Sequence, residues 1–107
     1  FTALLDCPNG HLRNQAYFNF HWPRLKQELS TMLIAAGIDS TESTFENDVF
    51  DVITKTQNNI SSMLQDARQA KQTEIDDING FAFRYLRSKN LEHKTNERLW
   101  KEVNKLR

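Results

Sequence analysis

Apolar side chains recur at intervals of three and four residues through most of this chain, which is the spacing of one face of an α-helix. The longest such run contains Phe18, Trp22, Leu25, Leu29, Met32, Leu33 and Ala36. The chain has only 3 Gly and 2 Pro among 107 residues, so few positions can supply the tight turns of an all-β domain. We therefore expect an all-α fold, a compact bundle of about five helices.

The same spacing predicts where the helices lie. The first is expected to begin near Trp22, with Pro23 in its first turn, and to end at Gly37; a kink at Pro23 is the alternative. Further helices are predicted at about 43–56, 61–70, 73–88 and 95–106. The inward face of the helix at 73–88 is predicted to carry Ile75, Ile78, Ala82, Phe83 and Leu86.

Polar residues near the predicted helix starts indicate caps. Ser43 and Glu46 have the spacing of a capping box. Asn59 is placed to cap the helix that follows it, and Thr73 with Asp76 forms another capping pair.

Charge and cysteine content exclude several classes of protein. The chain carries 14 Lys+Arg and 14 Asp+Glu, so it lacks the broad positive charge typical of nucleic-acid binders and polybasic membrane-surface domains. No apolar run approaches the length of a membrane span. Cys7 is the one cysteine; it cannot close an intrachain disulfide and fits a reducing, cytoplasmic location.

We expect no metal site, because the three histidines, His11, His21 and His93, lie far apart and none has a zinc-ligand spacing with Glu or Cys. The sequence begins with Phe1 rather than Met, which indicates a fragment or a processed chain.

Three polar segments are candidates for function. Cys7-Pro8-Asn9-Gly10 has the composition of a turn, and Asn58 to Asp66 gathers amides and hydroxyls at a predicted helix start. Thr73 to Gly80 places three acids within four positions at the next one. Each segment also has a purely structural interpretation, as a tight turn, an N-cap or carboxylates that stabilise a helix dipole.

Taken together, these segments resemble the C-terminal domain of ketopantoate reductase (2-dehydropantoate 2-reductase) in order and spacing. The resemblance implies one helical, substrate-side domain over residues 1–107 and an N-terminal dinucleotide-binding Rossmann domain that is absent here. It implies reduction of 2-dehydropantoate to pantoate with NADPH, on the route to pantothenate and coenzyme A. NADPH would be bound mainly by the absent domain, and the general-acid lysine would lie upstream of Phe1. The 107-residue chain alone is therefore expected to be inactive.

The resemblance also assigns roles to four residues. Asn9 would hydrogen-bond the substrate, and Ser62 would hold its carboxylate end. Asn59 would line the cleft near the cofactor. Glu74 would support catalysis near the reacting centre and contact the nicotinamide ribose. A carboxylate so close to an anionic substrate needs a cationic partner, and the upstream lysine could supply it.

Two alternatives remain open on the sequence. The parent enzyme could act on a related 2-keto acid. Otherwise the chain could serve as a helical dimerisation or interaction module that forms a homodimer, because the aromatic residues Tyr17, Phe18, Phe20 and Trp22 exceed what one helix face can bury.

Overall fold

In a computed structural model of the chain, residues 1–39 and 41–106 are described, and they form helices without any strand. The α-helices are α1 (Thr2–Leu5), α2 (Ala16–Ala35), α3 (Glu42–Lys55), α4 (Ser62–Arg68), α5 (Asn79–Ser88) and α6 (Lys94–Asn104), and the 3-10 helices are η1 (Asn9–Asn14) and η2 (Glu74–Asp76). The predicted all-α fold is confirmed. None of these described helices is both long and apolar enough to cross a membrane.

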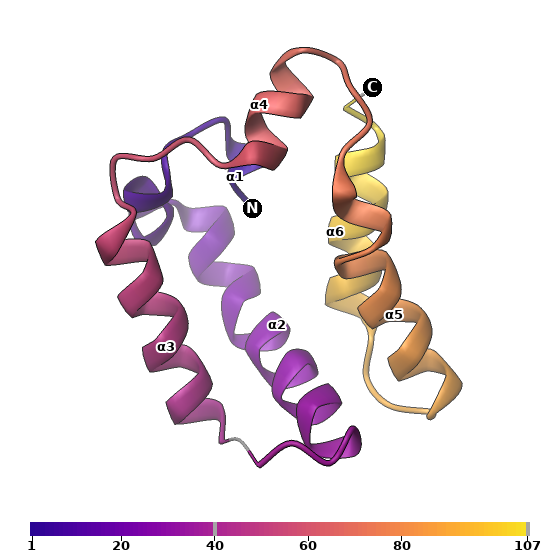
Figure 1. Ribbon diagram of the computed structural model, residues 1–107. Coiled ribbons are helices and arrows are strands. Elements are labelled where there is room, and N and C mark those ends of the chain that lie inside the picture. The colour runs from indigo at the N-terminus through magenta and orange to yellow at the C-terminus, as the bar shows by residue number, and fades with distance from the viewer. Residues whose placement is uncertain (40, 107) are drawn as a thin grey trace.

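Helix α2 is the central element of the bundle. It contacts α3 on one side and both α5 and α6 on the other, and α5 packs along α6. Figure 1 shows these two pairs, with the short helices α1 and α4 together at one end of the molecule. This arrangement brings the first residues of the chain next to the segment that precedes α4.

The apolar core forms where α2 meets its neighbours. Its buried members are Cys7, Leu12, Phe18, Trp22, Leu25, Ile53 and Leu99. The indole of Trp22 stacks on Phe18 with ring centroids 5.6 Å apart and lies 5.7 Å from the ring of Phe50 in α3. The helix spacing in the sequence therefore corresponds to real burial, because the face that repeats every three to four residues is the face that packs.

Helix α2 begins six residues before the predicted start, and Pro23 lies inside it. Proline costs a helix interior one backbone hydrogen bond. The added turns bury Phe18, which is 2% exposed and also packs edge-on against Phe1. Packing of this ring outweighs the local cost, so the predicted start near Trp22 is wrong. The predicted end is confirmed, because Gly37 follows the C-cap with φ +83°.

The helix predicted at 73–88 is divided into η2 and α5. The backbone of Ile78 leaves the helical region, with φ −105° and ψ −85°, and its side chain is 50% exposed instead of buried. The break turns Asp76 towards α6, where its Oδ1 accepts a hydrogen bond from Trp100 Nε1 at 2.5 Å. Contacts with a helix distant in sequence therefore interrupt a locally favourable pattern. The other four predicted inward residues are buried: Ile75, Ala82, Phe83 and Leu86.

The cap predicted for α3 is wrong. Its N-cap is Thr41, whose hydroxyl accepts the N–H of Thr44, so the helix begins before Ser43. Glu46 instead connects α3 with α2, because its Oε1 accepts a hydrogen bond from Trp22 Nε1 at 2.9 Å.

The cap predicted for α4 is also wrong, whereas at η2 the predicted cap by Thr73 is confirmed. Ser61, not Asn59, precedes α4 and accepts the N–H of Leu64 at 3.1 Å. Thr73 caps η2 through the N–H of Ile75 at 3.3 Å.

The aromatic group that suggested a dimer surface is mostly internal. Phe18 and Trp22 belong to the core, and the half-buried Tyr17 donates a hydrogen bond to Glu102 in α6. Phe20 is 59% exposed, with the Arg24 guanidinium over its ring. Packing within the domain thus accounts for three of these four side chains.

Candidate functional site

A cavity of about 290 Å³ lies where α1, α4 and η2 meet. It is lined by Phe1, Thr2, Ser61, Ser62, Met63, Asp66, Glu74, Ile78 and Asn79. The structure therefore brings Ser62 and Glu74, two of the four predicted site residues, to one place. A larger cavity of about 810 Å³ is lined mainly by α2, α6 and the residues just before α6; its walls carry charges of both signs and none of the predicted residues.

The contact between α1 and α4 positions the serines at the start of α4. Thr2 Oγ1 and Ser61 Oγ share a hydrogen bond of 2.6 Å, and Arg68 Nε donates to Asp6 Oδ1 at 2.7 Å. Ser61 is thus used for capping and packing. The hydroxyl of Ser62, one residue later, has no hydrogen-bond partner among the described residues and is available to a ligand in the cavity.

Two carboxylates line the cavity, Glu74 from η2 and Asp66 from α4. Neither side chain has an ion-pair partner within residues 1–39 and 41–106. Among the residues that the structure describes, no Lys, Arg or His side chain lines this cavity. An anionic substrate in this cavity would therefore need a cation from outside the lining. The predictions gave no role to Asp66 or to Asn79, although both belong to the segments singled out in the sequence.

Asn9 and Asn59 lie beside each other but do not line the cavity. The backbone N–H of Asn9 donates to the carbonyl of Asn59 at 3.0 Å. The amide Nδ2 of Asn9 donates to Thr56 Oγ1 at 2.9 Å. The first and second polar segments of the sequence are therefore joined through their backbones, two residues before Ser61.

The segment from Cys7 to Gly10 leads directly into η1, and neither Asn9 nor Gly10 has a positive φ. The second half of this segment thus forms the start of a 3-10 helix, without any left-handed residue. Gly10 is required for a different reason. Its N–H donates to the carbonyl of Gln57 at 2.9 Å, and a Cβ at this position would lie only 2.7 Å from that oxygen. The small residue allows two backbones to meet.

We expect Gly10→Ala to lower the free energy of unfolding by about 1–3 kcal/mol, because the added methyl group overlaps backbone atoms that cannot rotate away. Urea titration of the variant measures this loss. Asn14→Ala, an exposed position in the same 3-10 helix, is the control and should change stability by less than about 0.5 kcal/mol. Equal effects of the two substitutions would contradict the close approach of Gly10 and Gln57.

Cys7 has the properties of a core residue. It is 5% exposed, and burial raises the pKa of its thiol, so the neutral form is favoured and the nucleophilic thiolate is disfavoured. In the described part of the chain, no group of three or more His, Cys, Asp and Glu side chains could hold a metal ion.

Comparison with known proteins gives one consistent result. The whole chain, residues 1–107, matches the family model described as "Ketopantoate reductase PanE/ApbA C terminal". Among curated proteins, it is 37% identical over 106 residues to the 2-dehydropantoate 2-reductase of Shigella flexneri, covering 95% of this chain and 33% of that protein. It is 33% identical over 98 residues to the enzyme of the same name from Pyrococcus horikoshii, covering 92% and 32%.

The fold is also similar to a solved structure. A PanE/ApbA family ketopantoate reductase from Ralstonia eutropha superposes with a TM-score of 0.87 at 20% identity, over 98% of this chain and 35% of that one. The chain thus spans about a third of the length of the relatives it matches.

Proposed function

Because the chain belongs to the ketopantoate reductase PanE/ApbA C-terminal family, we propose that it forms the substrate-binding side of an NADPH-dependent 2-dehydropantoate 2-reductase. The observation that carries this proposal is the cavity that brings Ser62 and Glu74 together from separate segments. Both residues lie in the segments on which the resemblance depends. A reducing, cytoplasmic location fits the proposal, since Cys7 is a free, buried thiol.

Ser62 is assigned to the carboxylate of the keto acid. Its hydroxyl is unpaired among the described residues and can donate a charge-assisted hydrogen bond without adding an opposing negative charge. Asn9 lies outside the lining of this cavity, and it is assigned to the substrate on the resemblance. Its Nδ2 is held by Thr56, which leaves the amide oxygen to accept a hydrogen bond.

Glu74 is assigned to the hydroxylated, uncharged part of the site, near the nicotinamide ribose and the reacting carbonyl. Its carboxylate can accept hydrogen bonds from hydroxyl groups. Asp66 is in the same lining, and no described residue there has a cationic side chain, so the cavity fits ribose or nicotinamide but repels phosphate groups. We therefore assign the phosphates of NADPH to a Rossmann domain outside this chain, and Asn59 to the edge of the cleft near the cofactor.

Reduction of the ketone needs a hydride at the carbonyl carbon and a proton at its oxygen. The bound nicotinamide cofactor supplies the hydride. None of the described residues that line this cavity is a Lys or His that could supply the proton. We assign that proton to the family lysine upstream of Phe1, which also balances the charge of Glu74. The isolated chain is accordingly expected to be inactive.

The test is NADPH oxidation by the complete polypeptide that carries this chain, with 2-dehydropantoate as substrate. Ser62→Ala should lower kcat/KM roughly 10- to 100-fold through the loss of one hydrogen bond to a charged group. Glu74→Gln should lower it by about 100-fold. Asn9→Ala should also lower it, by about tenfold. Thermal unfolding of each variant checks that the fold is kept.

Matched controls come from α3, where Ser43→Ala and Glu42→Gln change exposed residues far from the cavity in sequence and outside its lining. These variants should retain wild-type turnover. Unchanged kcat/KM in both Ser62→Ala and Glu74→Gln would reject the assignment of the site. Turnover of another 2-keto acid in place of 2-dehydropantoate would correct the substrate and leave the reaction class in place.

A further inference from the structure

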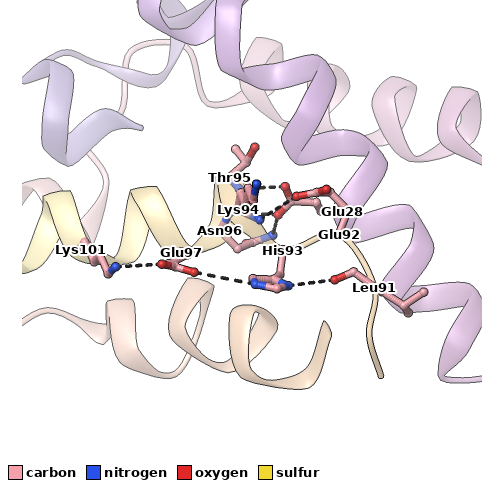
Figure 2. A network of polar contacts seen from close by, with 9 residues as sticks. All are labelled: Glu28, Leu91, Glu92, His93, Lys94, Thr95, Asn96, Glu97 and Lys101. Carbon is pink, nitrogen blue, oxygen red and sulfur yellow. Dashed lines mark hydrogen bonds and ion pairs between the residues drawn. The ribbon is translucent and has the colours of Figure 1, made fainter. Parts of the chain in front are cut away.

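A line of hydrogen-bonded side chains connects the middle of α2 with the cavity. Glu28 in α2 is 1% exposed, and its Oε1 accepts a hydrogen bond from Asn96 Nδ2 at 2.9 Å. Asn96 in α6 is 0% exposed, and its Oδ1 accepts one from Asn79 Nδ2 at 2.8 Å. Asn79 begins α5 and lines the cavity with Ser62 and Glu74. Figure 2 shows the first part of this line, with Glu28 facing the start of α6.

The acceptor at one end of the line orients every amide along it. A carboxylate has no hydrogen to donate, so Asn96 must direct its Nδ2 at Glu28 and its Oδ1 away from it. Asn79 must then direct its own Nδ2 at Asn96. The amide orientations, which are commonly ambiguous in a structure, are thus decided here by chemistry.

The group left over at Asn79 is its carbonyl oxygen. Among the described residues, Oδ1 of Asn79 has no hydrogen-bond partner. It is also absent from the buried side-chain atoms that lack a partner, so this oxygen is accessible from outside the protein. Asn79 therefore brings an oriented acceptor to a cavity whose other polar groups include the Ser62 hydroxyl and the Glu74 carboxylate. An acceptor held in one orientation selects ligands that donate, and a hydroxyl group is the donor that a hydroxylated keto acid or a ribose presents.

We propose that Asn79 is a binding residue whose Oδ1 accepts a hydrogen bond from a hydroxyl group of the bound ligand. Asn96 and Glu28 are positioning residues that prevent its amide from reversing. This inference rests on the proposed function and names a specificity residue for it. The hydroxyl belongs either to the keto acid or to the nicotinamide ribose, and the two sources give different results below.

The test compares two substrates and one cofactor in the complete polypeptide. The substrates are 2-dehydropantoate and 3,3-dimethyl-2-oxobutanoate, which differ only in the hydroxyl group. The Kd of NADPH is measured in parallel by fluorescence, independently of turnover. In Asn79→Ala, a contact to the keto acid predicts that the kcat/KM ratio of the two substrates falls about tenfold while the Kd is unchanged. A contact to the ribose predicts a Kd about tenfold higher and an unchanged ratio.

Asn79→Ser provides a second variant, because serine is well tolerated at a helix start but lacks the amide oxygen. Asn104→Ala is the matched control. Its Nδ2 donates to Asp76 at 3.4 Å, and Asn104 does not line the cavity, so it should change neither quantity. Asn96→Leu should reproduce the effect of Asn79→Ala on the ratio or the Kd, together with a loss of stability.

Two failures can be told apart. If the wild-type protein turns over 2-dehydropantoate with NADPH but neither the ratio nor the Kd changes in folded Asn79→Ala and Asn79→Ser, the assignment of Asn79 is overturned and the proposed function stands. If the wild-type protein does not reduce any 2-keto acid, the proposed function is overturned and the assignment with it.

Discussion

Replacing Glu28 with alanine is expected to lower the free energy of unfolding by about 3–5 kcal/mol. The carboxylate accepts the backbone N–H groups of Thr95 at 2.8 Å and Asn96 at 3.0 Å, in addition to the Asn96 side chain. The residue at the N-cap of α6, His93, makes no capping side-chain bond. Alanine would therefore leave three donors unpaired at a buried helix start (Figure 2).

Chemical unfolding of Glu28→Ala measures this loss, and Glu92→Ala is the control. Glu92 also accepts a backbone N–H near the start of α6, from Lys94 at 3.2 Å, but it is exposed and water can replace it. The control should therefore lose less than about 1 kcal/mol. Similar losses in both variants would show that the buried position of Glu28 does not matter. Glu28→Gln, which retains one acceptor oxygen, should fall between them.

The second large effect is expected at Trp22, where substitution by alanine should cost about 3–5 kcal/mol. The indole is 6% exposed and contacts the rings of Phe18, Phe45 and Phe50. Alanine would leave a cavity between α2 and α3 that rigid helices cannot close. Equilibrium unfolding in urea measures the loss. A loss below about 1 kcal/mol would mean that these rings do not form the centre of the core.

Trp22→Phe distinguishes the packing of the aromatic ring from the hydrogen bond of the indole, because phenylalanine keeps a ring but has no N–H to donate. Donation from Trp22 Nε1, followed by the charge of Lys26, lowers the pKa of Glu46. A carboxylate with a lowered pKa in the folded state stabilises that state above its ordinary pKa and loses the contribution as the pH falls through the lowered value. Trp22→Phe should therefore raise the pKa of Glu46 and reduce the acid sensitivity of folding. NMR titration of the Glu46 side chain measures the shift, with Lys26→Met as the comparison.

Much of the fold could be predicted because helix formation depends on near neighbours. The spacing of apolar residues placed a helix at 43–56, and the structure has α3 at Glu42–Lys55. Gly37 ends α2 as expected, because a left-handed residue after a C-cap is a local requirement. The errors arose where distant contacts outweigh local preference. The Phe18 ring extends α2 past Pro23, and the bond from Trp100 to Asp76 accompanies the break before α5.

The candidate site also has a part that could be predicted from the sequence and a part that could not. The segments around Ser62 and Glu74 could be recognised from the sequence, because a motif keeps its residues at a constant spacing along the chain. The roles of their neighbours could not. Ser61 and Ser62 are adjacent serines, and the structure distinguishes them. Ser61 caps α4 and contacts Thr2, whereas Ser62 is left to a ligand.

The sequence by itself therefore determined the helical class, most helix positions and two segments that line the candidate cavity, since each depends on residues a few positions apart. Tertiary structure alone decided which polar atoms reach the cavity. Glu28 and Asn96 are 68 positions apart, yet the carboxylate of one orients the amide of the other and, through it, Asn79. A hydrogen bond depends on the direction of donor and acceptor in space, and no spacing along a chain encodes that direction across two packed helices.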